Sequence, residues 1–355
     1  MKINFKVNLV AVAILLFGGI ALGTGVHFLH AYQVRANARS LLAQADEAEE
    51  EKEFRKAANY LGQYLGLVPT NNKAELARYG VLLDDMAKSP RDRMRPFFLL
   101  EQVLRQDDSN TDVRRRVVQI ALAIGRFNDA REHLKILTAA GLVDAEILHG
   151  QALCEVGEGH YAEAATFYAK AVELAPAQAD LCLEYAKLLR LHLDSTPLAT
   201  EVVTKMVAAG PRSAKVRLGA ARYYQSIGEH DLAEKSVLFA LNELKVQEPE
   251  AYLLAAKVAR SKGQKAIAKA HLEHGREANP DEGRLSLALA RQEFEAGRRE
   301  EALRLVRPSV AKLPDSEVEL WLLCKLLIDL GKVLRLNRLP YFLLKIKRFS
   351  SSSST

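Results

Sequence analysis

Two series of small residues recur along this chain with a period of 34 or 35 residues. The first series consists of Ala130, Ala164, Ala199, Ala233, Ala268 and Ala302, and the second consists of Gly125, Gly159, Gly228, Gly263, Gly297 and Gly331. The only longer gap in the second series, 69 residues, equals one skipped repeat. Paired small residues at such a period indicate an array of stacked helix pairs. Arrays of this kind bind other proteins and rarely carry out chemistry, so the period also constrains the class of function.

One repeat, residues 145–176, shows why the period predicts helix pairs. Apolar residues in its first half share one helical face, and Gly157 and Gly159 then interrupt that helix. In its second half the apolar residues recur at spacings of three and four around Ala164, until Pro176 ends the segment. We expect Ala164 to lie where the two helices cross closely. Neither helix can bury its apolar face alone, so neighbouring repeats must stack.

These residues resemble the tetratricopeptide repeat. The resemblance rests on a small residue in the first helix, aromatic residues and an alanine early in the second, and a proline after it; in residues 145–176 these are Ala152, Tyr161, Ala164, Tyr168, Ala171 and Pro176. Glu155 stands where the family usually has an aromatic residue. Two units, residues 73–108 and 177–210, match poorly, and the second has no turn glycine. The resemblance covers residues 40–331 and implies an all-α fold, a right-handed superhelical solenoid of about eight stacked antiparallel helix pairs.

The N-terminus carries an apolar stretch over residues 7–29. Its 23 residues would span about 34 Å as a helix, enough for a bilayer core of about 30 Å. Lys2 and Lys6 precede it, which predicts a cytoplasmic segment 1–6, a transmembrane signal anchor 7–29, a linker 30–40 and a solenoid 41–331 outside the cytoplasm, periplasmic in a bacterium. A signal peptide cleaved after residues 21–23 is the alternative. Gly19 and Gly23 would let two anchors pack, which predicts a homo-oligomer as one arrangement.

The net charge of +6 does not predict nucleic-acid binding. Six basic residues and no acids follow Asp329, and the rest of the chain holds 44 basic and 44 acidic residues. That tail, residues 332–355, combines apolar and basic residues with a serine run. It fits an atypical cap, a membrane-surface helix, or an array that has been cut short.

No residue pattern predicts catalysis, a metal or a cofactor. Cys154, Cys182 and Cys324 are widely separated, which favours buried free thiols over disulfides or zinc. His271 and His274 would share a helical face, but further ligands are not visible nearby in the sequence, so a solvated surface is expected. The chain is therefore predicted to be a membrane-anchored, non-catalytic scaffold for protein–protein interactions in the cell envelope. The alternatives are an accessory subunit of a polysaccharide or lipopolysaccharide assembly or export system, or the repeat region of a truncated enzyme such as a glycosyltransferase.

The resemblance also places a peptide-binding groove. In this family certain first-helix positions line the concave face, and counting back from the turn glycines assigns to that face Arg115, Arg116, Gln119, Arg222, Gln225, Lys257, Arg260, Arg284, Arg291, Phe294, Trp321 and Lys325. Acids are sparse in the predicted lining, with Asp112, Glu250 and Glu295 the main ones. Either these are ordinary solvated side chains, or they form a basic groove for an acidic extended peptide or a C-terminal carboxylate, which arginine pairs with bidentately.

Overall fold

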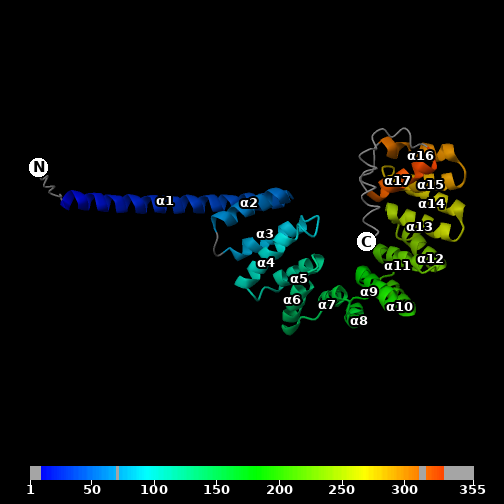
Figure 1. Ribbon diagram of the computed structural model, residues 1–355, viewed down its shortest axis with the longest axis horizontal. Coiled ribbons are helices and arrows are strands. Elements are labelled where there is room, and N and C mark those ends of the chain that lie inside the picture. The colour runs from blue at the N-terminus through cyan, green and yellow to red at the C-terminus, as the bar shows by residue number, and fades with distance from the viewer. Residues whose placement is uncertain (1–8, 69–71, 312–316, 332–355) are drawn as a thin grey trace. The chain divides into compact units, whose positions relative to one another are not determined.

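The structure, a computed structural model, describes residues 9–68, 72–311 and 317–331. These residues form 17 α-helices and no strand, so the predicted all-α class is confirmed (Figure 1). Two compact units divide the chain after Leu174. Unit 1 contains α1 (Leu9–Glu50), α2 (Phe54–Leu67), α3 (Lys73–Asp85), α4 (Met94–Gln106), α5 (Thr111–Ala123), α6 (Phe127–Ala139), α7 (Ala145–Glu158) and α8 (Tyr161–Leu174). Unit 2 contains α9 (Ala179–His192), α10 (Thr196–Ala209), α11 (Ala214–Ser226), α12 (His230–Asn242), α13 (Pro249–Ser261), α14 (Lys265–Ala278), α15 (Gly283–Glu295), α16 (Arg299–Ala311) and α17 (Glu317–Asp329).

Successive helices pair and the pairs stack within each unit. In unit 2 the closest contacts join α9 to α10, α11 to α12, α13 to α14 and α15 to α16. Each odd-numbered helix also contacts the next odd-numbered helix, from α9 through α17. The odd-numbered helices of this unit therefore form one continuous layer, with the even-numbered helices on its other side. Unit 1 repeats this arrangement from α3 through α7.

The two small-residue series have the predicted roles. All six alanines of the first series are completely buried at the helix pairs. The turn glycines adopt positive φ, as at Gly263, where φ is +75° and the next amide donates back to the carbonyl of Ala259. The repeat at residues 177–210, which lacks a turn glycine, turns by means of Asp194, which takes a left-handed φ of +49° before α10. Aspartate tolerates this conformation better than most residues, so α9 and α10 still pair.

Polar contacts join neighbouring repeats, and three of them show how the paired side chains vary from one junction to the next. The Arg131 guanidinium of α6 lies 3.3 Å from the Glu155 carboxylate of α7, 24 residues later. Lys269 of α14 lies 3.0 Å from Glu293 of α15, at the same separation in sequence. Between α10 and α11 the hydroxyl of Thr204 lies 3.2 Å from that of Tyr224 instead. Glu155, which departs from the family's aromatic residue, is thus accommodated by a base from the preceding repeat.

The N-terminal prediction is corrected by the structure. Helix α1 runs without a break from Leu9 to Glu50 and packs on α2 through Ala45 and Ala48. Across the described residues we find no helix with the length and apolarity needed to cross a bilayer. This finding overturns the predicted single-pass localisation, with its transmembrane helix and extracytoplasmic repeats. Residues 1–6 and the tail 332–355 lie outside the described residues.

Candidate binding groove

The predicted groove residues are distributed over both units. Arg115, Arg116 and Gln119 belong to α5 of unit 1, and the others belong to α11, α13, α15 and α17 of unit 2. All of these helices are odd-numbered members of the contacting layers. Each unit therefore has its own set, and the two sets differ in how their charges are paired.

In unit 1 the predicted cations are already paired within the chain. Arg115 lies 2.6 Å from Asp144, at the start of α7, and 3.0 Å from Glu146. Arg116 contacts Asp84 at 2.7 Å and also pairs with Asp85, both at the end of α3. The hydrogen bond from Arg115 lowers the pKa of Asp144, so this carboxylate is held in its charged form. Arg115 and Arg116 therefore brace neighbouring first helices and offer little free charge to a ligand.

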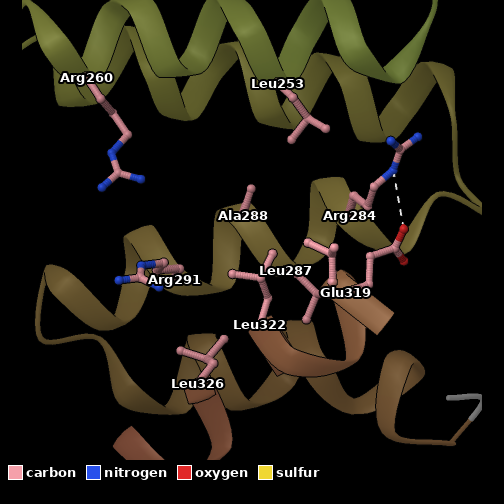
Figure 2. Close-up of a pocket in the computed structure, with 10 residues that line it drawn as sticks. Leu253, Arg260, Arg284, Leu287, Ala288, Arg291, Glu319, Leu322 and Leu326 are labelled. Atoms are coloured by element: carbon pink, nitrogen blue, oxygen red, sulfur yellow. Dashed lines mark ion pairs between the residues drawn. The ribbon is translucent and has the colours of Figure 1, made fainter. Parts of the chain in front are cut away.

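Unit 2 contains a hollow of about 360 Å³ between α13, α15 and α17 (Figure 2). Its walls are mainly apolar and include Leu253, Leu287, Ala288, Val318, Leu322 and Leu326. Arg260, Arg284 and Arg291 lie at its edges, together with Glu319. A neighbouring hollow of about 540 Å³ shares Leu253, Arg260 and Ala288 and continues along α13 past Lys257 and Ser261. Predicted groove residues from two successive repeats, on α13 and α15, thus line these two adjoining hollows.

The three arginines at the edges of the hollow are not equally available. Arg284 pairs with Glu250 at 2.5 Å and with Glu282 at 2.8 Å, and Glu319 lies 3.5 Å away. Its hydrogen bonds lower the pKa of both Glu250 and Glu282. At this end of the hollow the carboxylates outnumber the single guanidinium.

The opposite end of the hollow keeps positive charge. Arg260 lies 3.0 Å from one oxygen of Glu295, and Arg291 lies 3.1 Å from the other. Two guanidinium groups therefore share one carboxylate. Both arginines are about two-fifths exposed, and exposed ion pairs hold side chains only weakly.

The remaining predicted residues line the same layer with fewer intrachain partners. Within the described part of the chain, no ion-pair partner is recorded for Arg222 or Lys257, both of which are exposed. Lys325 lies over the ring of Trp321, 5.1 Å from its centre, and Phe294 carries Arg299 at 6.0 Å. Trp321 is half exposed, which leaves a large aromatic surface beside the hollow.

The sequence prediction missed most of the acids. Asp84, Asp85, Asp144, Glu146, Glu282 and Glu319 all contact predicted groove cations, although only three acids were expected in the lining. Asp144 caps the start of α7, where its side chain accepts the amide of Ile147, and Asp84 lies at the end of α3. The preference of aspartate for helix N-caps could have pointed to Asp144, but not to its contact with a neighbouring repeat.

Other candidate chemical groups have structural partners. Cys154 and Cys182 are buried free thiols, and burial raises the pKa of each to about 11, which makes them poor nucleophiles. Glu155, Glu158 and His160 cluster closely enough to suggest metal ligands. Both carboxylates, however, pair with Arg131, and the ring of His160 lies 3.0 Å from Glu155. An ion-pair cluster explains this group of side chains.

Comparison with known proteins identifies the fold. Neither a protein-family model nor a curated protein matches the sequence. Among solved structures, yeast Tom70 superposes with a TM-score of 0.57 at 16% identity, covering 88% of this chain and 66% of Tom70. The C-terminal part of a tetratricopeptide-repeat protein from Cytophaga hutchinsonii gives 0.50 at 14% identity, covering 69% of this chain and 98% of that one. A tetratricopeptide-repeat protein from Parabacteroides merdae gives 0.49 at 16% identity, covering 82% and 99%. The chain thus has the helical repeat fold of tetratricopeptide-repeat proteins.

Proposed function

We propose that this chain is a non-catalytic scaffold that binds an extended segment of a partner protein along the odd-numbered helices of unit 2. The hollow between α13, α15 and α17 carries the proposal. Its apolar walls suit an aliphatic or aromatic side chain, because burial of apolar surface is the main driving force of association. The excess charge at Arg260 and Arg291 suits a carboxylate next to that side chain.

This proposal refines the expectation of a basic groove. Carboxylates of the chain already neutralise Arg284, Arg115 and Arg116, so charge alone does not define a site there. The partner segment is therefore expected to combine one apolar anchor with an acidic residue. A uniformly acidic segment would meet Glu319 and Glu250 at one end of the hollow.

An array of immobilised peptides, probed with the purified chain, tests this function. We expect the bound peptides to be enriched in sequences that place Leu, Phe or Met beside Asp or Glu. Ala288→Trp should abolish this binding, because the indole would fill the hollow from its wall. Ala270→Trp is the matched control, since Ala270 is exposed on the even-numbered helix α14. Equal binding by both variants would place the partner elsewhere.

A further inference from the structure

One cation recurs at the same helical position in all five odd-numbered helices of unit 2. The residues are Lys187 on α9, Arg222 on α11, Lys257 on α13, Arg291 on α15 and Lys325 on α17, with spacings of 35, 35, 34 and 34 residues. The last four lie six residues before a turn glycine, and Lys187 extends the series into the repeat at residues 177–210, which has no turn glycine. These five residues are called the cation column below.

A second column of large apolar residues runs beside it. Leu183, Leu218, Leu253, Leu287 and Trp321 each precede a member of the cation column by four residues. Residues four apart lie on the same face of a helix, one turn from each other. Leu253 and Leu287 face the hollow from adjacent helices, as Figure 2 shows, and Lys257 and Arg291 line the two adjoining hollows.

The cation column is accessible. Lys187, Arg222, Lys257 and Lys325 are exposed, and Arg291 is two-fifths exposed. The ion pairs recorded for the described residues include only one of the five, Arg291 with Glu295. Unit 1 differs, because six residues before its turn glycines stand Gln119 and Leu153. The column is therefore a feature of unit 2 and does not follow from the repeat itself.

The spacing of the column selects a ligand conformation. Neighbouring packed helices lie about 8–10 Å apart, and the odd-numbered helices of unit 2 contact one another in sequence. A polyproline II helix has three residues per turn and rises about 3.1 Å per residue, so equivalent side chains recur about every 9 Å on one face. In a β-strand, side chains three residues apart point to opposite faces. The polyproline II conformation thus matches one side chain to each repeat.

We infer that the two columns bind an extended, polyproline II-like polypeptide with a carboxylate at every third residue, one for each member of the cation column. Apolar side chains of the partner segment, next to its carboxylates, would contact the second column of large apolar residues. This inference rests on the proposed function and adds to it the conformation and repeat of the partner segment. The segment crosses the odd-numbered helices of unit 2 between α9 and α17.

Fluorescence anisotropy with two labelled peptides tests the register. The first contains five copies of Glu-Leu-Pro, and the second has the same residues with its five glutamates in one block. The full chain should bind the first peptide at least about tenfold more tightly, and the affinity should rise with each added Glu-Leu-Pro copy up to five. Equal affinity for the two peptides would overturn the inference, because it would show attraction by charge alone.

Substitutions identify the surface that is used. Arg222→Gln and Lys257→Gln should each weaken binding of the first peptide by about two- to fivefold, as expected for exposed ion pairs. Arg115→Gln in unit 1 should leave it unchanged, and circular dichroism should show full helicity for all three variants. Unchanged binding by the unit 2 variants would overturn the inference, as would tighter binding of a polyphosphate chain than of the first peptide. The two proposals can fail separately. If Ala288→Trp abolishes binding to the peptide array while the two labelled peptides bind with equal affinity, the proposed function is supported and the inferred three-residue repeat is wrong.

Discussion

Nη1 of Arg114 lies 3.0 Å from Nδ1 of His133, deep between α5 and α6. A guanidinium group can only donate, so Nδ1 must accept and the proton of the neutral ring must sit on Nε2. Nε2 in turn lies 2.6 Å from Glu101 of α4, to which it donates. Arg114 is only 2% exposed and also binds Asp108. One histidine thus connects three helices of unit 1 and fixes its own tautomer.

This relationship predicts an observable tautomer and a cost for its loss. In nitrogen-15 NMR spectra the His133 ring should show a protonated Nε2 and an unprotonated Nδ1. His133→Phe should lower the free energy of unfolding by about 1–3 kcal/mol, because it removes partners from a buried arginine and a glutamate. Urea denaturation measures this change. A proton found on Nδ1 would contradict the arrangement, whatever the stability of the variant.

The buried alanines predict a packing limit at each helix pair. Ala268→Leu should destabilise the chain by about 1–3 kcal/mol, because Ala268 has no exposed surface and an added isobutyl group must displace its neighbours. Ala270→Leu, at an exposed position on the same helix, is the control and should change the midpoint little. The two thermal midpoints provide the measurement. Equal midpoints would mean that Ala268 does not lie at a close crossing.

The α14–α15 junction predicts a coupled pair. Glu293 is only 1% exposed, and hydrogen bonds from Arg298 and Lys269 lower its pKa. Lys269→Met should reduce the free energy of unfolding by about 1–3 kcal/mol, since it removes one partner of a buried carboxylate. Adding Glu293→Leu should recover part of that loss, because an apolar pair can replace a buried ion pair. Strict additivity of the two changes in a double-mutant cycle would contradict this coupling.

Replacing Glu319 is expected to raise the stability of the chain by an amount that depends on pH. Burial raises the pKa of Glu319 above its ordinary value, with Glu282 adding to the effect. A glutamate with a raised folded-state pKa destabilises the fold where it is ionised, and this cost disappears once both folded and unfolded states are protonated. Glu319→Gln should therefore raise the thermal midpoint at pH 7, and the gain should fade as the pH falls through the raised value toward the ordinary glutamate pKa of about 4.3. Glu173→Gln, an exposed control, should show no such trend. A gain that persists at low pH would indicate another cause.

Most of the repeat architecture was predictable because small residues have strict local requirements. Ala164 and Gly159 are constrained by a helix crossing and by a left-handed turn, and both constraints can be read from spacing alone. The turn at Asp194 was not predictable in this way, because an aspartate in the sequence indicates positive φ far less strongly than a glycine does. The prediction of a membrane anchor over residues 7–29 was wrong, because no helix among the described residues has the length and apolarity of a span. The sequence also did not show that α1 continues to Glu50 and packs on α2.

The groove itself stays a prediction. Counting back from turn glycines located Arg222, Lys257, Arg291 and Lys325, but it missed Lys187, whose repeat lacks that glycine. The same procedure considered one helix face at a time. It therefore overlooked acids such as Asp84 and Glu146, which reach the groove cations from adjacent helices. Charge pairing between repeats depends on how the helices stack. The spacing of residues along one helix does not show which residues of the neighbouring helices they contact.

The three polar junctions have a consequence for how such an array can evolve or be rebuilt. Arg131 contacts Glu155, Thr204 contacts Tyr224, and Lys269 contacts Glu293, so these three boundaries have different polar pairs. Exchanging whole modules would set a nearly inaccessible acid against a threonine, or a phenol against a lysine. The repeats are therefore not interchangeable, because the polar pairs at these boundaries depend on the order of the repeats. A chain with reordered repeats should be less stable than one built from identical copies.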